Sequence, residues 1–147
     1  MRAVPIAINN IDRATSLFDA YRVFYHQESN LSGCKEFLAS LLEGKKNHLW
    51  IAENEKGDEM GFVNLYPSFT SVGMAPVFIL NDLYVNPNYR KSGVGTFLLT
   101  HAADWAKTRG AIRLHLETGT DNHIAQKLYE GIGWKKEKDT YFYYLPL

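Results

Sequence analysis

The sequence has little of three things: cysteine, long apolar runs and charge of a single sign. Cys34 is the one cysteine, so neither a disulfide framework nor a thiolate zinc site can form within one chain. No run approaches the roughly 20 apolar residues that a membrane-spanning helix needs. Residues 1–18 lack the continuous apolar core of a secretory signal. We therefore expect a cytoplasmic protein with no membrane partner, in which Cys34 serves in packing.

The charges balance, with 16 basic and 16 acidic side chains. This balance excludes bulk electrostatic attraction to nucleic acid, so a charged ligand must be bound by a local cluster. The five histidines show no metal-ligand spacing such as H-E-x-x-H. We expect no nucleic-acid partner and no metal site.

What is present fits one domain over residues 1–147, with an apolar content of 46%. Residues 67–75 look like a loop, and the capping residues 120–122 predict a helix after them. The remaining apolar spacing predicts helices at 11–26, 32–44 and 94–109, and strands at 3–8, 48–53, 60–66, 77–85, 113–118, 134–138 and 140–145. This order predicts a mixed α/β fold, with helices packed on the faces of a central sheet.

The stretch from Leu83 to Leu99 combines a strand, a proline turn, a basic glycine-rich loop and an amphipathic helix. Glycines let backbone N–H groups approach a ligand, and a helix start leaves N–H groups unpaired beside a positive dipole end. That combination favours phosphate or pyrophosphate. Taken alone, a G-x-G sequence is equally typical of a tight strand-to-helix turn. The dinucleotide fingerprint fails at Leu98, which disfavours an oxidoreductase domain.

Two motifs give this stretch a context. Residues 83–95 resemble the acetyl-CoA loop of the Gcn5-related N-acetyltransferases, with the pattern [QR]-x-x-G-x-[GA] filled by Arg90, Gly93 and Gly95. Residues 122–134 resemble the same family's N-x-x-A-x-x-[LF]-Y-x-x-x-G-[FW]. The resemblance implies a mostly antiparallel sheet of six to seven strands, with a splayed parallel central pair and about four helices.

The resemblance also implies where acetyl-CoA, the co-substrate, is bound. Backbone groups of the splayed strand would meet the pantetheine arm, N–H groups of the loop would hold the pyrophosphate, and Asn122 would contact the far side. The implied cofactor-binding residues are Leu83, Tyr84, Val85, Arg90, Lys91, Ser92, Gly93, Val94, Gly95, Thr96, Asn122 and Ala125.

Tyr129 is implied to be the general acid that protonates the leaving thiolate. A free tyrosine titrates near ~10, so its phenol is protonated and can donate at neutral pH. The alternative is a core aromatic on an apolar helix face.

An attacking amine must lose a proton, so a base is useful. Glu117 is the first candidate because it resembles a strand glutamate with this role in family members, and Asp82 is the second. Each could instead be a solvated or ion-paired carboxylate. Asn81 stands where the polyamine-acetylating branch often has Glu, which weakens a simple polyamine assignment.

Residues of the expected acceptor side are Tyr25, Glu28, Tyr66, Phe69 and Asn81, although each could be an ordinary surface or core residue. Within the family, the sequence resembles the histone- and polyamine-acetylating branch, which suggests a homodimer formed through the C-terminal strands. The function implied is direct acetyl transfer from acetyl-CoA to a primary amine of a polyamine, amino acid, aminoglycoside-like molecule or protein lysine. The alternative is a non-catalytic acyl-CoA-binding or sensing module.

Overall fold

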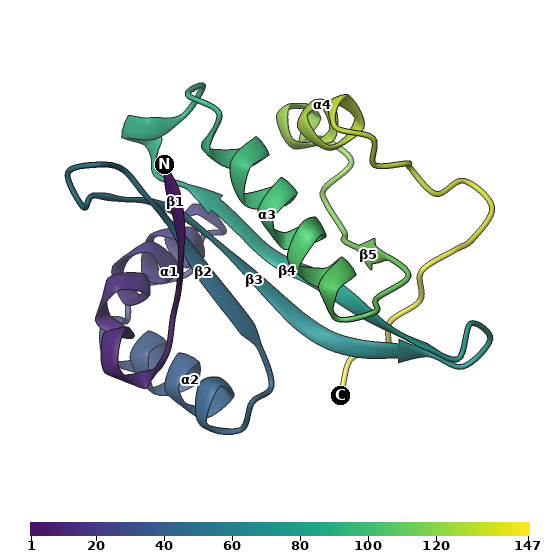
Figure 1. Ribbon diagram of the computed structural model, residues 1–147, viewed down its shortest axis with the longest axis horizontal. Helices are drawn as coiled ribbons and strands as arrows, with labels where there is room; N and C mark the ends of the chain where they lie inside the picture. Colours follow the sequence, from purple (N-terminus) through teal and green to yellow (C-terminus); the bar gives the residue numbers. More distant parts are fainter. The chain divides into compact units, whose positions relative to one another are not determined.

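A computed structural model describes residues 1–147, which form two compact units, Met1–Glu117 and Thr118–Leu147. We describe each unit separately (Figure 1). The first contains β1 (Arg2–Pro5), a 3₁₀ turn η1 (Ile8–Asn10), α1 (Asp12–Phe24), α2 (Leu31–Glu43), β2 (His48–Glu53), β3 (Glu59–Thr70), β4 (Ala75–Val85), η2 (Pro87–Tyr89), α3 (Val94–Thr108) and β5 (Leu114–His115). The second contains α4 (His123–Gly131).

The sheet has five strands in the order β1-β2-β3-β4-β5. The first four are antiparallel, and β5 is parallel to β4. The β4–β5 ladder has two pairs, Phe78 with Leu114 and Ile79 with His115. The mixed α/β class and the parallel last pair are therefore confirmed, whereas the expected count of six to seven strands is wrong.

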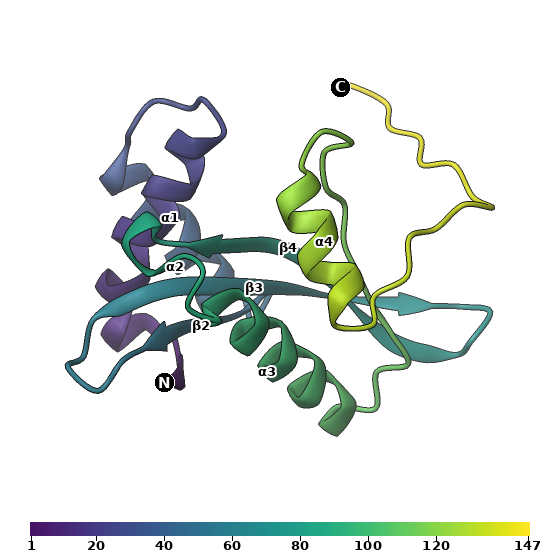
Figure 2. The same ribbon diagram turned by 90° about the horizontal axis from the view of Figure 1, so that it is seen from above.

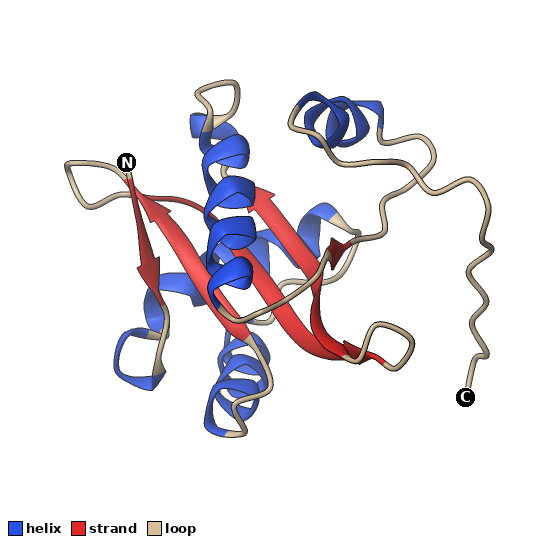
Figure 3. Ribbon diagram, turned by 45° about the vertical axis from the view of Figure 1, so that its right-hand side comes forward, coloured by secondary structure: helices blue, strands red, loops and turns tan.

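The missing strands are residues 134–138 and 140–145, which form no helix or strand (Figure 3, tan). A strand exists only where a neighbouring strand satisfies its backbone groups, so strand-like composition does not suffice. The aromatic side chains there are exposed, Tyr141 at 90% and Tyr143 at 86%.

Helices α1 and α2 cover one face of the sheet, and α3 covers the other (Figure 2). On the first face the ring of Tyr21 lies 5.6 Å from that of Phe62 and 6.3 Å from that of Tyr84. Because Phe62 and Tyr84 are register partners, this contact shows which side chains of β3 and β4 point toward α1.

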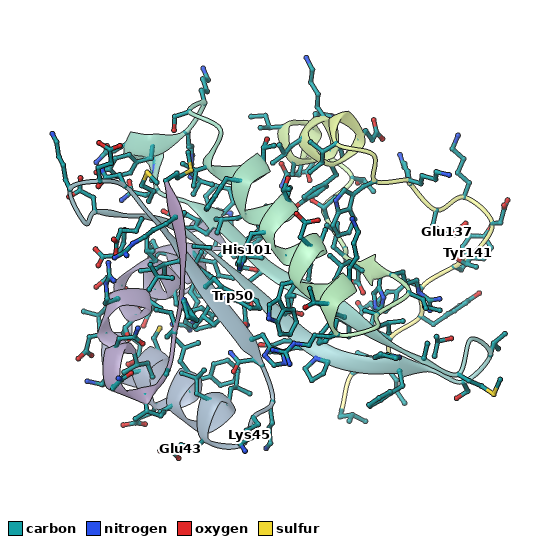
Figure 4. The ribbon with its side chains drawn as sticks, in the orientation of Figure 1. Glu43, Lys45, Trp50, His101, Glu137 and Tyr141 are labelled. Atoms are coloured by element: carbon teal, nitrogen blue, oxygen red, sulfur yellow. The ribbon has the colours of Figure 1, made fainter.

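The opposite face is aromatic where α3 packs. The Trp105 ring lies 4.8 Å from that of Trp50 and 5.1 Å from that of Phe78. His101 of α3 lies against Trp50, with 5.2 Å between ring centroids (Figure 4). Burial lowers the pKa of His101 below its usual value, and burial together with Arg109 does the same for His48.

One extra residue interrupts β4. Asn64 pairs with Asp82 and the next residue, Leu65, pairs with Leu80, so Asn81 has no partner on β3. This is a β-bulge, which re-aims side chains and breaks regular pairing. Asp82 and Tyr84, which follow the bulge, lie on the α1 face, whereas Leu80 before it and Leu83 after it both lie on the α3 face.

Other boundaries differ from the sequence prediction. Residues 67–70 continue β3 and residues 75–76 begin β4, so the expected loop at 67–75 is mostly a longer hairpin. Helix α2 is capped by Asn30, whose side chain accepts from the N–H of Gly33, and Ser32 lies inside the helix. Asn30 supplies the acceptor that an N-cap needs, and the helix begins at Leu31, one residue before the predicted start at residue 32.

Within the second unit, Asn122 caps α4 by accepting from the N–H of Ala125. The helix ends before Gly133, whose φ of 96° requires glycine-like freedom. Across both units, no helix is long and apolar enough to cross a membrane.

Candidate functional site

The start of α3 presents unpaired N–H groups. The first helical hydrogen bond runs from the N–H of Phe97 to the carbonyl of Gly93. The N–H groups of Val94, Gly95 and Thr96 therefore have no partner in the helix. Gly93 has a φ of 84°, and a Cβ built on it meets no atom of the chain within 4 Å. This open helix start fits an anion such as the CoA pyrophosphate.

The two cations of the loop are used differently. Arg90 donates from Nε to the carbonyl of Val85 at 3.1 Å, and its guanidinium lies 5.7 Å from the Phe24 ring centroid. Arg90 thus joins the loop to the end of α1. Lys91 is exposed, with a left-handed φ of 61°. Lys91 is therefore the cation of this loop that is free to follow a ligand.

The open edge of β4 exposes backbone groups where β5 has diverged. The N–H of Asn86 donates to Met60 on β3, so alternation directs the backbone of Tyr84 to β3 and that of Leu83 and Val85 to the opposite side. Leu83 can therefore offer its N–H and carbonyl to an extended ligand. Val85 can offer its N–H, because Arg90 occupies its carbonyl. Tyr84 offers neither group.

A pocket of about 190 Å³ lies where β4 and β5 part. It is lined by Ile79, Leu80, Asn81, His115, Leu116 and Glu117. Asn81 and Glu117 each lie two residues beyond the last ladder pair, Ile79 with His115. Both are exposed. The structure thus brings together one predicted acceptor-side residue and the first predicted base.

Asp82 lies behind this pocket on the α1 face, where it is 4% exposed. Its two carboxylate oxygens accept from Asn64 at 2.8 Å and from Asn81 at 3.0 Å. Burial raises the pKa of Asp82 above its usual value, against the lowering effect of hydrogen bonds from Asn64, Tyr21 and Asn81. Asp82 does not line the pocket.

Sequence reasoning missed the residues that hold Asp82. Asn47 donates to Asn64 at 2.9 Å, and Asn64 donates onward to Asp82. These residues come from different strands and their connections, so no local spacing reveals them. One feature of the sequence could have indicated this network: Asn64 is a polar residue within the otherwise apolar run of a strand suited to the core.

The other predicted acceptor-side residues do not form one cluster. Tyr66 is half-buried beside the Asp82 network, and burial raises the pKa of its hydroxyl above its usual value. Tyr25 is 52% exposed and packs edge-on against Tyr21, with 5.0 Å between centroids. Phe69 lies five residues along β3 from Asn64, about 17 Å away at the usual strand rise.

The connection between α1 and α2, which carries the exposed Glu28, is held by hydrogen bonds to side chains of α1. Asp19 of α1 accepts from the N–H of Asn30 and the hydroxyl of Ser29, both at 2.7 Å. Arg22 donates to the carbonyl of Glu28 at 3.2 Å. The hydrogen bond from Asn30, followed by that from Ser29, lowers the pKa of Asp19. Asp19 was not predicted, because an acidic residue on a helix is ordinarily a solvated one.

The second unit carries Asn122 and Tyr129 on one helix. They are seven residues apart, which places them on the same side of α4 two turns apart. Tyr129 is half-buried, and its ring lies 5.9 Å from that of Trp134. The side-chain oxygen of Asn122 is used as the helix cap, so its NH₂ group remains to meet a ligand.

Known proteins of similar sequence and structure identify the family of this chain. The sequence profile of the acetyltransferase (GNAT) family matches residues 14–134. An uncharacterized N-acetyltransferase of Bacillus subtilis (strain 168) is 46% identical over 126 residues, which cover 86% of this chain and 83% of that protein. An aminoglycoside N(6′)-acetyltransferase type 1 of Acinetobacter genomosp. 13 is 35% identical over 69 residues, which cover 46% of this chain and 47% of that protein.

A crystal structure described as that of a probable acetyltransferase superposes with a TM-score of 0.94. The two proteins are 36% identical, and the match covers 100% of this chain and 98% of the other. The profile match spans most of the residues described above, including the α3 loop and α4. The chain belongs to the acetyltransferase (GNAT) family and is an N-acetyltransferase.

Proposed function

We propose that this enzyme transfers the acetyl group of acetyl-CoA directly to a primary amine. The observation that carries the proposal is the open start of α3, three unpaired N–H groups behind the left-handed Gly93, next to the free backbone edge of Leu83. Such an edge and helix start suit an extended pantetheine arm that ends in a pyrophosphate. Acetyl-CoA supplies an activated thioester.

The chain's own residues would then manage charge and protons. The N–H of Leu83 would donate to the thioester carbonyl oxygen, where negative charge develops. The amine nitrogen forms the new C–N bond as the C–S bond breaks. One amine proton passes to a carboxylate, directly or through water, and the departing sulfur takes the phenolic proton of Tyr129.

Glu117 is the better placed of the two carboxylates for this proton. It lines the pocket between β4 and β5 and is exposed, so an amine or a water molecule can reach it. Asp82 is buried and its oxygens are held by amides. A general base must first lie within hydrogen-bond reach of the proton that it removes, and its pKa matters only after that. We therefore assign the proton transfer to Glu117.

The acceptor class is a primary amine of a polyamine, amino acid, aminoglycoside-like molecule or protein lysine. A neutral pocket wall at Asn81, in place of an acidic one, argues against a polyamine-specific enzyme. The similarity to an aminoglycoside acetyltransferase supports including aminoglycosides among the first amines tested.

The deciding experiment is an amine panel with acetyl-CoA, followed by thiol release, for wild type and Tyr129→Phe. Loss of a general acid lowers turnover by something like 10²–10⁴-fold. We expect this fall in kcat with little change in acetyl-CoA affinity measured by calorimetry. Binding of acetyl-CoA without acetylation of any amine would instead support a non-catalytic acyl-CoA-binding module.

We also propose that the protein forms a homodimer through its C-terminal segment, residues 139–147. The segment carries large apolar side chains that are 69–117% exposed, from Tyr141 to Leu147. A second copy of the chain would bury them and supply strand partners. Light scattering after size exclusion should give a dimer for the full chain and a monomer for a chain that ends at Lys138. A full-length monomer at micromolar concentration would refute the dimer.

A further inference from the structure

The bulge at Asn81 places one polar residue outside the regular pattern of β4. Phe78 packs on Trp105 of α3, and Tyr84 packs toward Tyr21 of α1, so the two halves of the strand are both well packed. Asn81, between them, is exposed and has no register partner. Bulges beside active sites commonly re-aim one side chain. Asn81 is the extra residue of this bulge, the one without a partner on β3.

Asn81 and Glu117 lie on the two sides of the opening that begins where β4 and β5 part. The last ladder pair is Ile79 with His115; Asn81 lies two residues further along β4, and Glu117 lies two residues beyond the end of β5. Both line the same pocket of about 190 Å³. A pocket of that size admits the amine-bearing end of a substrate, with the remainder outside.

The orientation of the Asn81 amide is fixed by Asp82. Its Nδ2 donates to Asp82 Oδ1 at 3.0 Å. Both oxygens of the Asp82 carboxyl accept from amide NH₂ groups, so the carboxyl holds the NH₂ end of the Asn81 amide toward itself. Asp82 is held in turn, because its Oδ2 accepts from Asn64 at 2.8 Å and Asn64 accepts from Asn47 at 2.9 Å. The carbonyl oxygen of Asn81 is therefore left as the open acceptor of this chain of amides.

We propose that Asn81 orients the acceptor amine by accepting one N–H of the attacking nitrogen, opposite Glu117. This inference rests on the proposed function. Asp82 is a positioning residue that acts through Asn81. One N–H must point to Asn81 while another proton leaves toward Glu117, so the nitrogen needs two hydrogens when it attacks. The site is therefore selective for primary amines over their N-methyl derivatives, which carry one.

The test compares each primary amine that the enzyme acetylates with its N-methyl derivative. We expect wild type to prefer the primary amine by at least about tenfold in kcat/KM. A hydrogen bond to a group that becomes charged is worth roughly 10- to 100-fold, so Asn81→Ala should lower kcat/KM for the primary amine by about that factor. The N-methyl derivative should change little, and the preference should collapse with the KM for acetyl-CoA unchanged.

Two further variants separate this role from a structural one. Asp82→Asn puts an amide, which donates as well as accepts, in place of a carboxyl that accepts at both oxygens, so the Asn81 amide is no longer held in one orientation and the same preference should fall. The variant that combines Asn81→Ala with Asp82→Asn should have a kcat/KM no lower than that of Asn81→Ala alone. The effects of two residues that act through each other are not additive. Ser68→Ala, on β3 opposite Val77, is the matched control and should keep the wild-type ratio. Thermal unfolding checks that each variant folds, and the exposed Asn81 makes its replacement safe.

An unchanged preference in Asn81→Ala refutes the inference and leaves the proposed function standing. If the losses in kcat/KM of Asn81→Ala and Asp82→Asn multiply in the combined variant, Asp82 does not act through Asn81. If the wild type turns over no amine at all, the proposed function fails, and this inference fails with it.

Discussion

Asn64 and Asp82 are register partners on neighbouring strands, and Asn64 Nδ2 lies 2.8 Å from Asp82 Oδ2 in the interior of the first unit. This pair places a carboxyl group where apolar packing would be expected. A buried carboxyl is tolerated when its oxygens are hydrogen-bonded, yet its charged form is still disfavoured relative to water. The ionisation of Asp82 should therefore contribute measurably to how the free energy of unfolding changes with pH.

The first prediction concerns that contribution. The folded-state pKa of Asp82 is raised, so between the unfolded value near ~3.9 and the folded value the native state binds more protons than the unfolded state. Its contribution to stability therefore falls as pH rises through this window. Urea unfolding of wild type and Asp82→Asn from pH 3.5 to 7.5 should show the wild type losing stability relative to the variant as pH rises. Parallel curves would contradict the raised pKa.

The second prediction concerns the two histidines under α3. Burial lowers the pKa of both His48 and His101, so below about pH 6.5 the unfolded state binds more protons than the folded state. Stability should fall as the solution is acidified through this range. His101→Gln should weaken the slope of unfolding free energy against pH between 5 and 7. His123→Gln, on the exposed side of α4, is the control and should leave the slope unchanged.

The third prediction separates backbone strain from ligand contact at Gly93. Gly93 has a φ of 84° and Gly110 one of 74°, and a Cβ at either meets no atom of the chain within 4 Å. Alanine at either position should cost about 1–2 kcal/mol of stability, because left-handed backbone is strained for residues with a Cβ. Calorimetry should show weakened acetyl-CoA binding for Gly93→Ala alone. Equal affinities in the two variants would move the pyrophosphate away from the start of α3.

The fourth prediction concerns the connection between α1 and α2. Asp19→Ala removes the acceptor for the Asn30 N–H and the Ser29 hydroxyl, which should cost on the order of 1–3 kcal/mol. Amide hydrogen exchange at Asn30 should accelerate well beyond the global loss of stability. Because the pKa of Asp19 is lowered, wild type should also lose this contribution as pH falls below about 4. If exchange at Asn30 accelerates only as much as global unfolding does, the hydrogen bonds of Asp19 do not stabilise this connection locally.

Much of the fold was readable from local pattern. Strand β2 occupies the predicted residues 48–53, and α3 begins at the predicted Val94 and is followed by the left-handed Gly110. These elements have strong apolar periodicity and clear end signals. The mixed α/β class follows from their order, and the parallel β4–β5 pair was implied by the family resemblance.

The errors arose where structure depends on distant partners. Residues 140–145 have strand-like composition and form no strand, since strand formation depends on an adjacent edge. The hairpin of β3 and β4 runs through Pro67 and Ser68, which local signals mark as a loop. In the site, the sequence could propose Glu117 and Asn81 separately. Their meeting at one pocket, and the amides that hold Asp82, depend on register and on a bulge that periodicity does not reveal.

The bulge has a consequence for protein engineering. Removing Asn81 from the chain would leave β4 with regular alternation, in which Ile79, Asp82 and Tyr84 keep the α1 side and Leu80 and Leu83 keep the α3 side. A one-residue deletion in a central strand normally inverts every side chain beyond it. Here the shortened chain should keep the packing of both faces and lose the hydrogen bond from Asn81 to Asp82. The alternation of β4 therefore does not require Asn81.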